Sequence, residues 1–173
     1  WGWVNMAVAL AVGFSGYLRP GGVGDLTARD FKLVHSDGLN IVGVVVAIHK
    51  AKTRFRAARV QAVYIDNRSV AVLVALWLKT AWPRERLVPG GYAELTHRFK
   101  SLLCAAKASS LPLTVASLRG GGAVADMLKG RKDLARIMMH GRWDAIKTLN
   151  HFLQEGMALL TRCRLSLSVQ TLH

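Results

Sequence analysis

Residues 16–31 are GYLRPGGVGDLTARDF, the stretch that decides the fold. Gly16 ends an apolar, uncharged run of fifteen residues, as a glycine commonly ends a helix. Pro20 fixes its own φ at a value that suits a helix start. We therefore expect a buried helix over residues 1–15, a turn at 17–22 that holds Arg19, and a short helix over 23–31.

The segments after residue 31 predict a small sheet and then helices. Ile41–Ile48 and Val60–Ile65 are apolar and β-branched, which favours an antiparallel hairpin. Val70–Trp82 is densely apolar and stops at Pro83, and apolar residues recur at helical spacing through most of the remaining chain. The predicted fold is mainly α with a small antiparallel β-hairpin or sheet.

Length and apolar content predict one domain. The chain has 173 residues, of which 51% are hydrophobic, enough for one sizeable core. We expect a single domain over residues 1–173, with its core at about 8–155 and a C-terminal tail at 156–173. The first residue is Trp1 rather than Met, which suggests a piece of a longer polypeptide. The longest uncharged apolar stretch, residues 1–14, is shorter than the roughly 20 residues that span a bilayer.

Charge and cysteine content point to a polyanionic partner in a reducing compartment. Lys and Arg number 24 against 10 Asp and Glu, a net charge of +14. Such an excess favours nucleic acid; a merely soluble basic domain and an anionic membrane surface are the alternatives. Cys104 and Cys163 form no CxxC motif and no Cys/His cluster, so we expect no disulfide framework, no metal site and no cofactor. The expected location is intracellular, with DNA, in nucleus or cytoplasm.

Two basic features suggest phosphate contacts. Between the predicted strands lie five cations without an acid, Lys50, Lys52, Arg54, Arg56 and Arg59. Like charges in one loop repel each other unless an anion joins them, which favours a phosphate contact over a merely solvated loop. Arg119 stands at a predicted helix start before Gly120, Gly121 and Gly122, where free backbone N–H groups attract phosphate and glycines would let a DNA backbone approach. A capping arginine beside a glycine loop is the alternative.

Two segments resemble the arginine boxes of tyrosine recombinases, the phage-integrase family. Residues 16–31 are similar to the Gly-Leu-Arg-Pro-Gly-Glu box, which implies that Arg19 is the first catalytic arginine, although Gly22 replaces the usual glutamate. Residues 117–123, SLRGGGA, resemble the His-x-Leu-Arg box and make Arg119 the second arginine. Ala116 replaces its histidine, so the general acid/base of that position is missing.

The resemblance extends to the nucleophile segment and the hairpin. Residues 139–143, MHGRW, resemble the box before the nucleophile helix and place Arg142 at the phosphate. In the variant families that carry Gly-Arg-Trp, Thr-x-x-x-Tyr comes next; here Phe152 falls on the tyrosine. Lys52 fits the family's hairpin lysine, which protonates the departing 5′ oxygen, and Lys50 is the alternative for this position.

The resemblance implies a tyrosine-recombinase catalytic-domain-like fold that binds duplex DNA, a degenerate member of the family and a remnant of a mobile element. Phe152 has no oxygen with which to attack phosphorus, so the covalent step of integration or recombination is lost. The implied site is Arg19, Lys52, Arg119, Arg142 and Phe152. Family members often assemble as oligomers on DNA, and residues 156–173 suit that role. Two alternatives stay open: an active strand-transferase with another nucleophile, and an unrelated basic helical domain that contacts RNA or protein.

Overall fold

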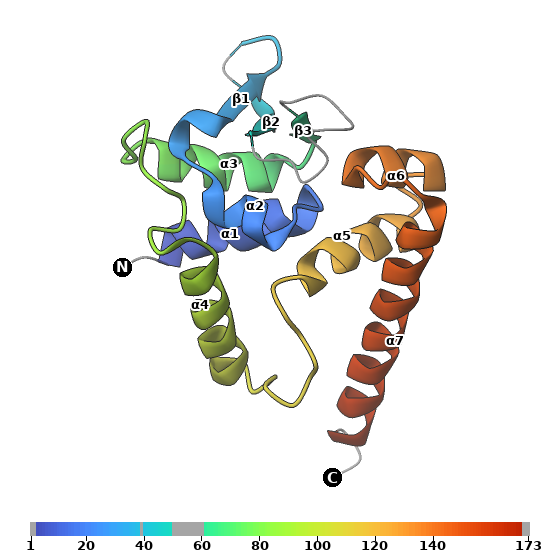
Figure 1. The fold of residues 1–173 in the computed structure, drawn as a ribbon. Helices are drawn as coiled ribbons and strands as arrows, with labels where there is room; N and C mark the ends of the chain where they lie inside the picture. The colour runs from blue at the N-terminus through green and yellow to red at the C-terminus, as the bar shows by residue number, and fades with distance from the viewer. Residues whose placement is uncertain (1–2, 39, 50–60, 171–173) are drawn as a thin grey trace.

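The computed structural model describes residues 3–38, 40–49 and 61–170, and Figure 1 shows their arrangement. The described chain is mainly helical with one small antiparallel sheet, which confirms the predicted class. The sheet, α1 and α3 lie together at one end, and α5, α6 and α7 form a second group beside them (Figure 1).

The N-terminal segment has the expected apolar helix but not the expected second one. Helix α1 spans Trp3–Ser15, and α2 spans Pro20–Asp25 with its proline in the first turn. The expected helix over 23–31 is wrong, because Leu26 is extended and ends α2. A single 3-10 turn comes next, closed by reciprocal hydrogen bonds between Thr27 and Asp30, and a strand starts immediately after it.

The sheet has one strand more than predicted. Strands β1 (Phe31–His35), β2 (Ile41–Ile48) and β3 (Gln61–Ile65) pair antiparallel in the order β1-β2-β3. The predicted β2–β3 pair is confirmed, with Val45 opposite Tyr64. The inner face is fully apolar at Val44, Val46 and Ile65, and it packs on α3.

Two helices complete the first group. Helix α3 (Arg68–Leu78) begins at Asn67, whose side chain accepts a hydrogen bond from the Val70 N–H. Helix α4 (Gly91–Ala105) packs against α2. We call the buried apolar residues from Met6 to Val115, with the exception of Tyr17, the sheet core.

The second group consists of α5 (Ser117–Leu128), α6 (Leu134–Gly141) and α7 (Ile146–Gln170). Helix α5 lies between α1 and α7 and contacts both (Figure 1). Helix α7 is the longest and runs through residues 156–170, so the expected tail continues it without a break. The buried residues of this group, which we call the helical core, are Tyr17, Ala123, Val124, Ile137, Trp143, Leu149 and Leu153.

Tyr17 joins the two groups. It adopts a left-handed φ of 47° between α1 and α2 and is fully buried in the helical core, although its neighbour Leu18 belongs to the sheet core. The turn that carries Arg19 is therefore fixed between the two cores. In the ranges that the structure describes, no helix is long and apolar enough to cross a bilayer.

Candidate functional site

Three arginines from different elements share one site between the two groups. Arg19 is the residue before α2, Arg119 lies in the first turn of α5, and Arg142 follows the last residue of α6. The positive charge of Arg19 lowers the pKa of both Arg119 and Arg142, and Arg142 also lowers that of Arg119. The three arginines that the sequence singled out therefore lie close enough for their charges to interact.

Arg119 is the central member of this arginine site. Its side chain is almost completely enclosed, with 5% of its surface exposed. Its Nη2 donates a hydrogen bond of 2.6 Å to the carbonyl oxygen of Gly141. The guanidinium carbon lies 4.5 Å from the ring centre of Trp143 and 5.7 Å from that of Phe152, which are cation–π distances. The guanidinium group is thus held in one orientation by backbone and aromatic contacts.

Burial makes the two inner arginines costly to keep charged. Loss of water, followed by the charges of Arg19 and Arg142, lowers the pKa of Arg119 to about 9. Loss of water and the charge of Arg19 lower the pKa of Arg142 to about 10. Asp144 opposes the shift at Arg119, but no ion pair joins it to any of the three arginines within the described ranges. An anion placed among these cations would reverse the unfavourable interactions.

Several buried hydrogen-bond donors of the site have no acceptor. In the described part of the chain these are Nε of Arg119, Nη1 of Arg142 and the indole Nε1 of Trp143. A buried donor without an acceptor costs about 1–3 kcal/mol, so three of them around one set of cations are unusual in a folded protein. Two of these donors belong to guanidinium groups, for which the oxygens of an oxyanion are suitable acceptors.

The Gly141-Arg142-Trp143 turn explains how two of these donors reach the site. A Cβ at residue 141 would lie 1.8 Å from the Trp143 ring, so only glycine lets that ring fold back over the end of α6. Arg142 adopts a left-handed φ of 54°, which ends the helix and reverses the chain. The turn thereby directs Arg142 and Trp143 toward Arg119.

The glycines after Arg119 have a different role from the one expected. A Cβ at Gly122 would lie 2.0 Å from the carbonyl oxygen of Phe14, and a Cβ at Gly120 would contact Phe152. These glycines let α1 and α7 approach α5, and they do not form an open loop. The expectation that they admit a DNA backbone is wrong, because protein atoms already occupy that space.

Phe152 lies in α7 at the position that the resemblance assigns to the tyrosine. Its ring is half-buried, and it packs 5.7 Å from the Trp143 ring and beside Arg119. Phe152 therefore borders the arginine site but brings no oxygen to it. Gly22 and Ala116, which replace the family's glutamate and histidine, likewise bring no functional group.

Tyr17 borders the arginine site, a position that the sequence did not predict. Its ring lies between those of His140 and Trp143, at 4.6 and 5.9 Å. Its hydroxyl donates a 2.6 Å hydrogen bond to Asp126, which also forms an ion pair with Lys132 at 2.9 Å. Only its position two residues before Arg19 hinted at this role.

The same contacts prevent Tyr17 from acting as a substitute nucleophile. Burial, followed by its hydrogen bond to Asp126 and the charge of that carboxylate, raises the pKa of the Tyr17 phenol well above its ordinary value. A nucleophilic phenol needs the opposite shift. The hydroxyl is therefore a structural donor.

The remaining predicted site residues belong to the basic loop between β2 and β3. Its predicted site residues lie outside the described residues: Lys50, Lys52, Arg54, Arg56 and Arg59. Within the described ranges, no group of three or more His, Cys, Asp or Glu side chains is arranged to hold a metal ion.

Comparison with known proteins adds no family to these observations. No family model matches the sequence, and no curated protein matches it significantly.

Proposed function

We propose that this chain is a DNA-binding domain that holds a backbone phosphate at Arg19, Arg119 and Arg142 without cutting the strand. The observation that carries the proposal is the arginine site itself. Arg119 is buried and Arg142 is half-buried, both with lowered pKa values, and three enclosed donors lack acceptors among the described residues. A phosphodiester supplies both the negative charge and the acceptor oxygens that this arrangement lacks.

The net charge of the chain supports a polymeric anion over a small one. A net charge of +14 attracts polyanions and raises their concentration near the protein. Duplex DNA carries one charge per about 1.7 Å of its axis, so several cations outside the arginine site would contact it as well. We therefore favour DNA over a free phosphate metabolite.

The finer part of the proposal is that the fold is that of a tyrosine-recombinase catalytic domain that has lost its chemistry. The order of the three arginines along the chain and the Gly141-Arg142-Trp143 turn support it. Phe152 keeps an aromatic ring 5.7 Å from the Arg119 guanidinium, so the shape expected of the nucleophile's surroundings remains while its oxygen is absent.

Duplex binding tests the phosphate site directly. We expect the wild type to bind a 30-base-pair duplex with an affinity that falls steeply as salt rises. Arg119→Met should weaken binding at least tenfold at fixed salt, because the central guanidinium is lost. Lys100→Met removes one exposed charge on α4 and serves as the matched control, with a change of no more than about twofold. Equal affinity of the two variants would contradict the proposal and favour a basic domain for RNA or protein.

The loss of cleavage is tested on a nicked suicide substrate that traps a covalent adduct. The wild type should form no adduct, because Phe152 has no nucleophilic atom. An adduct with the wild type would establish an active strand-transferase and overturn this part of the proposal. An adduct formed by Phe152→Tyr, and abolished in Phe152→Tyr with Arg119→Met, would identify the recombinase geometry of the site.

A further inference from the structure

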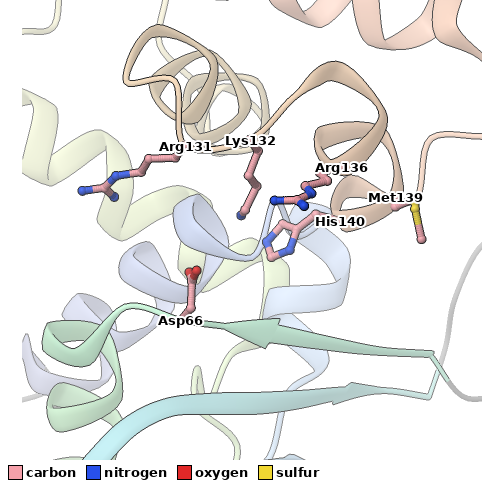
Figure 2. A pocket seen from close by; sticks show the side chains of 6 residues that line it. All are labelled: Asp66, Arg131, Lys132, Arg136, Met139 and His140. Atoms are coloured by element: carbon pink, nitrogen blue, oxygen red, sulfur yellow. The ribbon is translucent and has the colours of Figure 1, made fainter.

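A second basic hollow lies beside the arginine site. It has a volume of about 390 Å³, and Figure 2 shows its lining: Asp66, Arg131, Lys132, Arg136, Met139 and His140. Asp66 comes from the junction of β3 and α3, and the others come from the α5–α6 connection and α6. The hollow therefore opens where the sheet group meets the helical group.

Three cations line this hollow, and two of them already have a carboxylate nearby, Lys132 with Asp126 and Arg136 with Asp133. Asp126 is already engaged by the Tyr17 hydroxyl and by Lys132. Asp133 caps α6 by accepting the Arg136 N–H at 2.7 Å, and its other oxygen lies 3.8 Å from Nε of Arg136. Asp66 is the one carboxylate among the lining residues, against three permanent cations. Arg131 and Arg136 are exposed, so both can turn toward a ligand.

A row of rings connects this hollow to the arginine site. His140 lines the hollow, and its Nε2 lies 2.9 Å from the carbonyl oxygen of Ser15. From its ring, successive contacts of 4.6, 5.9 and 4.5 Å lead through Tyr17 and Trp143 to the Arg119 guanidinium. A duplex held at Arg119 would carry other phosphates within this short span, since its charges are so closely spaced.

We infer that the hollow lined by Arg131, Lys132, Arg136 and His140 binds a second phosphate group, that of the same DNA backbone. This inference rests on the proposed function. The two sites together would fix the direction of the backbone across the seam of the two groups, which one phosphate contact alone does not do. Asp66 limits the affinity, because it faces the same space with a negative charge.

The test measures duplex affinity as a function of salt for Arg131→Ala/Arg136→Ala. Each neutralised phosphate contributes about 0.9 to the slope of log affinity against log salt, so loss of the one phosphate held in the hollow should lower the magnitude of the slope by about 0.9. Lys79→Ala/Lys100→Ala removes two exposed charges from α3 and α4 and is the control, with a clearly smaller change. Equal slopes for the two double variants overturn the inference. Absence of duplex binding by the wild type instead overturns the proposed function.

Asp66→Asn is a second test, in which the duplex affinity is expected to rise instead of fall. If the hollow holds a backbone phosphate, removal of this charge tightens duplex binding a few-fold and leaves the thermal midpoint nearly unchanged. If Asp66 instead serves as a structural partner of the nearby cations, the midpoint falls and affinity does not rise, which overturns the inference.

A titration with inorganic phosphate distinguishes a DNA phosphate from a free phosphate ion as the ligand of the hollow. In the wild type, phosphate should shift the NMR signals of the His140 ring, and the shift should disappear in Arg131→Ala/Arg136→Ala. A phosphate shift combined with an unchanged salt slope would assign the hollow to free phosphate and overturn the DNA source.

Discussion

Two buried charges, one in each half of the molecule, show how differently the halves are built. Asp30 lies beside the sheet core, where it accepts hydrogen bonds from the N–H and hydroxyl of Thr27, and His49 lies 2.9 Å from its other oxygen. Arg119 lies beside the helical core with a single hydrogen bond to Gly141, and its Nε has no acceptor among the described residues. The first charge completes a local structure, whereas the second leaves bonding capacity for a ligand.

The comparison predicts the largest loss of stability at Asp30. Asp30→Ala leaves the Thr27 donors and the His49 ring without their partner, and we expect the free energy of unfolding to fall by about 3 kcal/mol. Urea denaturation of Asp30→Ala and of the exposed control Asp37→Ala measures the difference. A loss at Asp30 no larger than at Asp37 would show that this carboxylate is dispensable.

The second-largest loss of stability is expected at the close contact between α1 and α5. Gly122→Ala places a methyl group 2.0 Å from the Phe14 carbonyl oxygen, so α1 and α5 must separate at a cost of about 1–3 kcal/mol. Gly22→Ala is the control, because nothing lies within 4 Å of its added methyl group. Thermal midpoints should fall for the first variant and stay level or rise for the second.

The hydrogen bond between Tyr17 and Asp126 joins the two halves, and the pH dependence of stability tests its contribution. Tyr17→Phe should lower the free energy of unfolding by about 1 kcal/mol at pH 7, the usual contribution of one hydrogen bond. The pKa of Tyr17 is raised in the folded state, so its hydroxyl contributes fully below the unfolded phenol's pKa of about 10 and less above it. The difference between wild type and variant should therefore narrow above pH 10. A constant difference up to pH 11 would contradict this account.

The smallest change in the free energy of unfolding is expected at Arg119. Arg119→Met replaces a buried, under-bonded cation with an apolar side chain of similar length, and such replacements are often neutral or stabilising. We expect the free energy of unfolding to stay the same or rise slightly, in contrast to Asp30→Ala. A large loss of stability would show that Arg119 is a structural charge and would remove the contrast between the halves.

Local sequence signals predicted most elements of this fold but missed one strand. The ends of β2 and the presence of the apolar helices followed from composition and periodicity, although α3 ends at Leu78 and does not continue to Trp82. Strand β1 was missed because Phe31–His35 is short and contains Lys32, and its pairing depends on β2 rather than on its own pattern. The turn before it is set by Thr27 and Asp30, whose reciprocal hydrogen bonds have the spacing of a helix start.

The arginines of the site were singled out from the sequence, but the way the site is built was not predicted. Arg19 and Arg119 stood out through their glycine-rich surroundings, and Arg142 through the resemblance of residues 139–143. The sequence did not show that Gly120 and Gly122 serve helix packing, or that Trp143 covers Arg119. These features arise from contacts between segments far apart in the chain, which no local pattern encodes.

The Tyr17 hydroxyl reaches a carboxylate 109 positions later, at Asp126. Closing so long a loop is slow compared with forming local contacts. During synthesis the residues of the sheet group emerge before Arg119 and Arg142 are translated. The arrangement of the three arginines is therefore complete only after the two groups have docked, late in the formation of the fold.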